Sequence, residues 1–148
     1  MLSKPYHGWT DFQLSGTTVY QLSYLNDLPF DWLDQAIRGL ETMQPFCVKG
    51  FLEPGRLLCA VSYRSCHILT EDEETGTLTS TESSHTTMLD FCKALHRDIA
   101  AFPGDWAVFA NRKADTTQKE TQLREKLAKL QHLITARESL FDDSHFFL

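Results

Sequence analysis

The sequence predicts an α+β domain: an antiparallel β-sheet of about five to six strands packed on one face by two amphipathic helices, plus a C-terminal helix. Three observations lead to this prediction. Strand-like segments follow one another in hairpins with short turns between them. Later and intervening segments repeat apolar residues at helical spacing. The chain has 148 residues, the length of one domain, and can bury a core without a metal or a disulfide.

The N-terminal segments predict a hairpin followed by a helix. Short strands are expected over residues 9–14 and 17–24, where β-forming residues partly alternate with polar ones. The helix should begin near Pro29, a residue that suits a first helical turn, and end near Met43. Its apolar residues are spaced three, four and three apart, which places them on one face. This stripe consists of Phe30, Leu33, Ile37 and Leu40.

The next hairpin has a predicted register. A two-residue turn at Pro54-Gly55 would place Glu53 opposite Arg56, as an ion pair across the strands. Because side chains alternate along a strand, one face of this hairpin is then apolar and the other is mixed. The apolar face comprises Phe46, Val48, Gly50, Leu52, Leu57, Cys59, Val61 and Tyr63.

The cysteines of this region could indicate a metal or redox site, but the register argues against one. It places Cys47 on the face opposite Cys59, and a following two-residue turn would pair Val61 with Ile68. Cys59 and Cys66 would then share the core face on the order of 14 Å apart, at ~3.4 Å per residue. This separation is too large for a disulfide. We therefore expect buried, unreactive thiols, no metal site and no cofactor.

An acidic turn follows, made of Glu71, Asp72, Glu73 and Glu74, before an edge-like strand over residues 77–81. These carboxylates lack the spacing of a calcium-binding EF-hand loop. The turn can keep a sheet edge soluble, or it can meet a basic patch on a protein partner. We expect it to belong to a partner-binding surface.

Two further helices are predicted. Thr87 and Asp90 resemble a capping box at the start of the first, and Thr117 and Glu120 at the start of the second. Between them, residues 105–110 form either a last strand or a packed connection. The apolar stripe of the first consists of Met88, Cys92, Leu95, Ile99 and Phe102, and that of the second of Leu123, Leu127, Leu130 and Ile134.

The chain divides into an α+β core domain over residues 1–111, a C-terminal helix over 112–140 and an apolar tail over 141–148. The narrow stripe of the C-terminal helix can pack on the core domain or pair with another helix. A homodimer through this helix or the tail is therefore one possible assembly.

Candidate reactive and binding residues are few. Cys92 and His96 would face each other on a helix, and a histidinium can activate a thiol, but Cys92 belongs to the apolar stripe. A buried cysteine beside a boundary histidine is the favoured interpretation, and no catalytic residue is predicted. The aromatic side chains of Tyr6, His7, Trp9 and Trp32 are instead candidates for partner binding, together with the acidic turn.

The charge and the apolar runs restrict the partners further. A formal net charge of −6 argues against a nucleic-acid partner. No apolar run reaches the length of a membrane span, and the first residues do not form a signal peptide, so a cytoplasmic location and no membrane partner are expected.

The predicted function is that of a small, soluble, non-catalytic protein-interaction domain that uses an acidic surface. The small, acidic build without catalytic motifs resembles that of bacterial accessory proteins, including toxin-immunity proteins. The alternatives are a small-ligand-binding α+β domain, or an enzyme that depends on cysteine and histidine.

Overall fold

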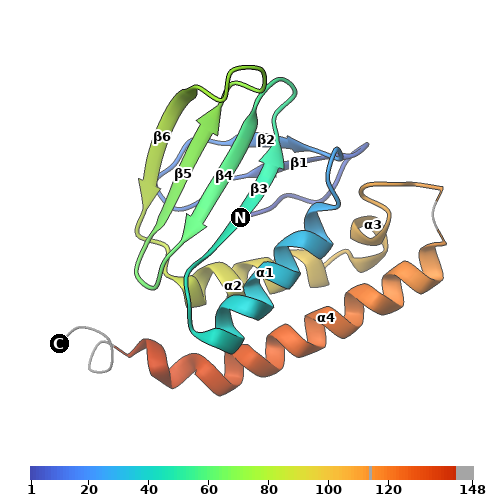
Figure 1. The fold of residues 1–148 in the computed structure, drawn as a ribbon. Coiled ribbons are helices and arrows are strands. Elements are labelled where there is room, and N and C mark those ends of the chain that lie inside the picture. The colour runs from blue at the N-terminus through green and yellow to red at the C-terminus, as the bar shows by residue number, and fades with distance from the viewer. Residues whose placement is uncertain (114, 143–148) are drawn as a thin grey trace.

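The computed structural model describes residues 1–113 and 115–142, which form an α+β fold with six strands in two antiparallel sheets (Figure 1). The first sheet pairs β1 with β2, and the second has the order β3-β4-β5-β6. The strands are β1 (Trp9–Phe12), β2 (Tyr20–Ser23), β3 (Phe46–Phe51), β4 (Arg56–Val61), β5 (Cys66–Glu71) and β6 (Leu78–Ser84). The helices are α1 (Leu28–Thr42), α2 (Met88–Ala100), α3 (Pro103–Ala107), α4 (Thr116–Arg137) and a 3₁₀ turn, η1 (Glu138–Phe141).

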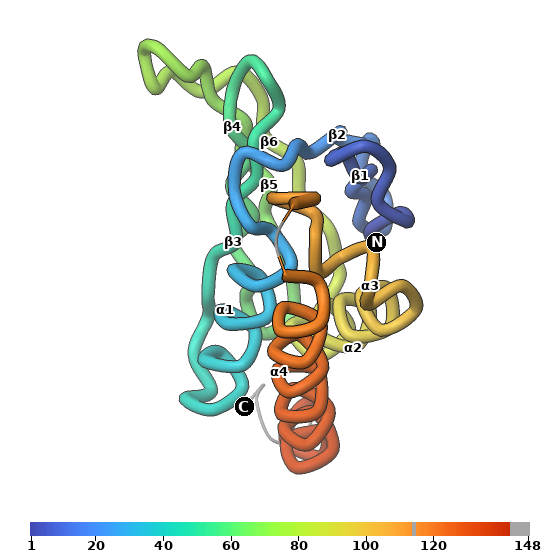
Figure 2. The backbone as a smooth tube through the Cα atoms, turned by 90° about the vertical axis from the view of Figure 1, so that its right-hand side faces the viewer, coloured from blue at the N-terminus to red at the C-terminus, as the bar shows by residue number. Residues whose placement is uncertain are grey.

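The prediction of a single sheet is wrong, because β1 and β2 form a separate hairpin beside the four-stranded sheet (Figure 2). This hairpin packs on the sheet through its side chains, and Leu22 of β2 lies against Gly50 of β3. A Cβ atom at Gly50 would lie 2.9 Å from the Leu22 side chain, so the position admits no larger residue without movement. Leu22 and Phe12 are fully buried as a result.

The predicted register of β3 and β4 is wrong by two residues. Phe51 pairs with Arg56, and the turn occupies four residues, 52–55, closed by a hydrogen bond from the Leu52 N–H to the Gly55 carbonyl at 2.9 Å. The predicted Glu53–Arg56 ion pair is therefore not formed. A shift of two residues keeps every side chain on its predicted face. Cys47 is exposed, whereas Cys59 is buried on the other face.

The second hairpin shows the same two-residue difference. Val61 pairs with Cys66, and the Ser62 N–H donates to the Ser65 carbonyl at 2.9 Å across a four-residue turn. The expected edge strand is present as β6, which pairs with β5 alone within the described residues. The run over 105–110 is not a strand, since it contributes to α3 and the connection that follows.

The core lies between the four-stranded sheet, the β1–β2 hairpin and the helices. Trp32 and Phe91 stack with ring centroids 6.0 Å apart, and Phe46 of β3 meets Phe91 edge-on at 5.8 Å. The predicted apolar stripes of α1, α2 and α4 are buried except at Phe30, which is half-buried, and Phe102, which is 37% exposed. The hydroxyl of Thr87 caps α2 by accepting the Asp90 N–H, as the capping-box pattern predicts.

Helix α4 packs parallel to α1 and also contacts α2 and α3 (Figure 1). Its N-cap lies two residues before the predicted capping box, because the Asp115 side chain accepts the N–H groups of Thr117 and Gln118. Three acidic residues spaced seven apart bind lysines of α4. These pairs are Asp27–Lys119 at 2.7 Å, Asp34–Lys126 at 2.6 Å and Glu41–Lys129 at 3.5 Å.

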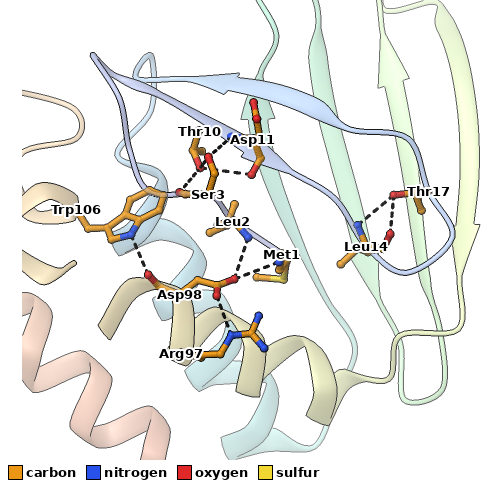
Figure 3. Close-up of polar contacts among 10 residues, drawn as sticks. All are labelled: Met1, Leu2, Ser3, Thr10, Asp11, Leu14, Thr17, Arg97, Asp98 and Trp106. Carbon is orange, nitrogen blue, oxygen red and sulfur yellow. Dashed lines mark hydrogen bonds and ion pairs between the residues drawn. The ribbon is translucent and has the colours of Figure 1, made fainter. Parts of the chain in front are cut away.

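The N-terminal segment is fixed to α2 by Asp98 (Figure 3). Its carboxylate accepts the Leu2 N–H at 2.9 Å, lies 3.3 Å from the Met1 amino group and accepts from Arg97 at 2.9 Å. Its carbonyl accepts the indole N–H of Trp106 at 3.2 Å. Partial burial acts to raise the pKa of the Asp98 carboxyl, but these donors and the amino group outweigh it and hold the pKa below its ordinary value.

Candidate functional site

One face of the four-stranded sheet is covered by no other element among the described residues, and we call it the outer face (Figure 2). The register arranges its side chains in three rows that cross the four strands. From β3 to β6 the rows are Phe51, Arg56, Glu71 and Leu78; then Lys49, Leu58, Leu69 and Thr81; and then Cys47, Ala60, His67 and Ser83.

The outer face has an apolar centre with a polar border. Leu58 and Leu69 are paired and half-buried, and Leu78 at the β6 edge is 57% exposed. Arg56 binds Glu71 at 2.6 Å beside them. An apolar centre surrounded by polar groups is the usual arrangement of a protein–protein interface.

The acidic turn lies at one end of this face, and its four carboxylates have different roles. Glu71 is neutralised by Arg56. Asp72 holds the turn: its carboxylate accepts the N–H groups of Thr75 at 3.0 Å and Glu74 at 2.9 Å, which lower the pKa of Asp72. Glu73 and Glu74 are exposed and form no ion pair among the described residues.

A second acidic contribution comes from the neighbouring turn. The β3–β4 and β5–β6 turns lie at the same end of the sheet, so the exposed Glu53 joins the acidic turn there (Figure 1). The β5–β6 turn also projects beyond the other strands (Figure 2). We call Glu53, Asp72, Glu73 and Glu74 the acidic end of the sheet.

A groove of about 540 Å³ runs between α1 and β3 and opens onto the outer face. Burial raises the pKa of Asp31, although a hydrogen bond from Asn26 opposes the shift, and burial also raises the pKa of the Cys47 thiol. Both groups therefore release their protons less readily than in water, and the Cys47 thiol is not activated as a nucleophile. The groove is lined by Asp31, Trp32, Asp34, Gln35, Arg38, Cys47, Val48, Lys49 and Leu58.

The candidate aromatic residues do not form one site. Trp32 is fully buried in the core, and its indole N–H donates to the Lys49 carbonyl at 2.9 Å, which removes it from the exposed surface. Trp9 is half-buried in β1. Tyr6 is 73% exposed and His7 is exposed, and they line a separate pocket beside α3.

Three cysteines, Cys59, Cys66 and Cys92, are fully buried free thiols, and we call them the core cysteines. The predicted 14 Å between Cys59 and Cys66 is wrong, because the true register makes them diagonal cross-strand neighbours, which lie about 7–8 Å apart. The interaction with the neighbouring Cys66 thiol, together with burial, raises the pKa of the Cys59 thiol. The Cys66 thiol donates to the Thr86 carbonyl at 3.3 Å.

Burial of Cys92 argues against nucleophilic chemistry by the Cys92–His96 pair. Burial raises the pKa of the Cys92 thiol far above neutrality and lowers that of His96. A thiol held protonated in the core is a poor nucleophile. Within the described residues, no three His, Cys, Asp or Glu side chains gather where they could hold a metal ion.

Sequence reasoning missed two features of the surface. It expected helices on one face of the sheet only and placed Leu58 on the mixed face of the hairpin, but it did not single out Leu58, Leu69 and Leu78 as an exposed apolar surface. It also did not single out Arg112, whose guanidinium donates to His7 Nδ1 at 2.9 Å. The two positions are 105 residues apart in the sequence, so no local pattern could have linked them.

No family model, curated protein sequence or solved structure matches this chain. No helix among the described residues is long and apolar enough to cross a membrane. The functional argument therefore depends on the surface itself.

Proposed function

We propose that this chain is a non-catalytic protein-interaction domain that binds its partner through the outer face and the acidic end of the sheet. The observation that carries the proposal is the uncovered outer face, with Leu58 and Leu69 at its centre and Leu78 at its β6 edge. An exposed apolar centre of this kind marks an interaction surface.

The acidic end indicates the chemistry of the partner. Of its carboxylates, Glu53, Glu73 and Glu74 are exposed and hold no ion pair among the described residues, so their charge is available to a partner. In contrast, the acidic residues at the start of α1 and along it that face α4 are paired within the chain. A partner with an apolar patch beside a basic patch would match both parts of this surface.

The experiment compares two matched variants. Leu78 is 57% exposed on the outer face, and Val19 is 54% exposed on the loop of the β1–β2 hairpin. Each is replaced by serine, and proteins recovered by tagged wild type, Leu78→Ser and Val19→Ser from source cells are quantified by mass spectrometry. We expect one protein that wild type and Val19→Ser recover equally and that Leu78→Ser loses.

The role of the acidic end is then tested by measuring how this chain associates with the recovered protein, once that protein has been purified. Replacement of Glu73 and Glu74 by serine should slow association and flatten its dependence on salt, because exposed charges mainly steer the encounter. Equal recovery of the partner by Leu78→Ser and wild type would contradict the proposal. An association rate that changes neither with replacement of the glutamates nor with salt concentration would also contradict it.

A further inference from the structure

A second concave site lies away from the outer face, where the N-terminal segment meets α3. It has a volume of about 460 Å³, within the usual range for small-molecule sites. A tight turn forms one wall: Tyr6 and Trp9 exchange two backbone hydrogen bonds, at 2.8 and 3.0 Å, across His7 and Gly8. The lining residues are Lys4, Pro5, Tyr6, His7, Gly8, Asp105, Val108, Phe109 and Arg112.

The charge of this pocket is unusual for an acidic chain. Lys4 and Arg112 line it and form no ion pair within the described residues, whereas the α4 lysines at 119, 126 and 129 are all paired with carboxylates. Asp105 is the single carboxylate in the lining. The lining therefore keeps an excess of positive charge in a chain whose net charge is −6.

The hydrogen-bonding groups in the lining also favour an anion. A guanidinium can only donate, so the bond from Arg112 to His7 Nδ1 leaves that nitrogen unprotonated and places the ring proton on Nε2. The remaining N–H groups of Arg112, the His7 Nε2–H and the Lys4 ammonium are then donors. The planar guanidinium matches the paired oxygens of a carboxylate or a phosphate.

Apolar rings border the donors. Tyr6 is 73% exposed and packs edge-on against the His7 ring, with centroids 4.1 Å apart. Phe109 lines the pocket, and Lys4 Nζ lies 4.9 Å from the centre of the Phe102 ring. A ligand with an apolar group beside its anionic group would contact both the rings and the donors.

We propose that this pocket binds a small organic anion, a carboxylate or a phosphate monoester attached to a flat apolar group, with Arg112 and Lys4 holding the anionic end. The site shares no lining residue with the outer face. Its test is therefore independent of the proposed protein partner.

The test uses NMR titration of the whole chain with four probes: phenyl phosphate, benzoate, inorganic phosphate and benzyl alcohol. The signals followed are the Tyr6 and His7 rings and the backbone amides of residues 4–9. We expect saturable shifts with phenyl phosphate or benzoate at a Kd on the order of millimolar. The stronger of the two identifies the preferred anionic group. Inorganic phosphate and benzyl alcohol should each bind more weakly, because each lacks half of the recognised chemistry.

Two variants distinguish direct contact between Arg112 and the anion from the long-range electrostatic effect of the chain's net charge. Arg112→Gln should weaken binding about tenfold or more, since it removes charged hydrogen bonds. Lys113→Gln removes the same charge one position away, from an exposed residue that does not line the pocket, and should leave binding nearly unchanged. Thermal melting confirms that both variants are folded.

Three results would overturn the proposal. The first is the absence of saturable shifts with both aromatic anions. The second is equal weakening by Arg112→Gln and Lys113→Gln, which would assign the effect to long-range charge. The third is equal affinity for benzyl alcohol and the aromatic anions, which would leave no role for the cations.

Discussion

The glycine at position 39 gives a sharp test of the core. For its replacement by alanine, helix propensity predicts a higher free energy of unfolding and core packing predicts a lower one. Gly39 lies within α1, where alanine is favoured over glycine by about 1 kcal/mol. However, a Cβ atom at this position would lie 2.3 and 2.8 Å from two ring carbons of Phe46. Phe46 is 4% exposed and packs against Phe91, so its ring has little room to move.

The magnitudes decide the sign of the effect. Forcing an additional methyl group into a packed core costs about 1–3 kcal/mol, and the severity of this clash places it in the upper part of that range. After subtraction of the propensity gain, Gly39→Ala should lower the free energy of unfolding by about 1–2 kcal/mol. This corresponds to a fall in Tm of roughly 2–8 °C for a chain of this size.

The chain supplies a matched control in α3. At Gly104 the nearest atom to an added Cβ is Glu120 Oε2 at 3.9 Å, which is an ordinary contact. Gly104→Ala should therefore keep the propensity gain and stabilise the fold by up to about 1 kcal/mol. Urea unfolding followed by the fluorescence of the buried tryptophans measures both variants.

A double-mutant cycle identifies the contact. Phe46→Leu alone should destabilise the chain, but together with Gly39→Ala it should recover part of the alanine penalty, because the smaller side chain makes room. If Gly39→Ala proves as stable as wild type, or if the two substitutions simply add, the packing of α1 on β3 described above is incorrect.

Three further predictions concern the anchor, the thiols and the C-terminal helix. Asp98→Asn should lower the free energy of unfolding by about 1–3 kcal/mol at pH 7. Because the pKa of Asp98 is depressed in the folded chain, the stability that Asp98 contributes is complete above the ordinary pKa of 3.8 and is lost as the pH falls through the lower folded pKa. The free energy of unfolding, measured from pH 7 to 3, should therefore fall less steeply in the variant than in wild type. A thiol reagent should modify Cys47 in the folded chain and the core cysteines only on opening; rapid labelling of more than one thiol would contradict their burial. Leu130→Ala should cost about 2–5 kcal/mol, because Leu130 is fully buried, and the melting temperature should not depend on protein concentration; a dependence would show that the chain associates with itself.

Face assignment was the part of the fold that the sequence predicted best. Both hairpin registers were wrong by two residues, because four-residue turns replaced the expected two-residue turns. The faces remained correct, since the side-chain period of a strand is two. The separation of Cys47 from Cys59 therefore held, whereas the distance from Cys59 to Cys66 did not.

Helix positions and their buried stripes were predictable for a related reason. The repeat of apolar residues extends over three or more turns in α1, α2 and α4, so an error of one residue at an end changes little. The division into two sheets was not predictable, because it depends on the close approach of Leu22 to Gly50 across 27 intervening residues. Of the predicted tail over 141–148, residues 143–148 lie outside the described part of the chain, so the predictions that concern the tail stay predictions.

The distribution of charge explains why the acidic end is the best candidate for steering a partner. A net charge of −6 spread evenly would give no direction to an encounter. Here Asp27, at the start of α1, and the α1 residues Asp34 and Glu41 are neutralised by lysines of α4, and Glu71 is neutralised by Arg56. The exposed carboxylates of two adjacent turns then stand at one end of a sheet whose outer face is apolar at its centre. A basic partner drawn to that end would reach Leu78 first and then Leu69 and Leu58, so attraction and apolar contact follow one another along the same surface.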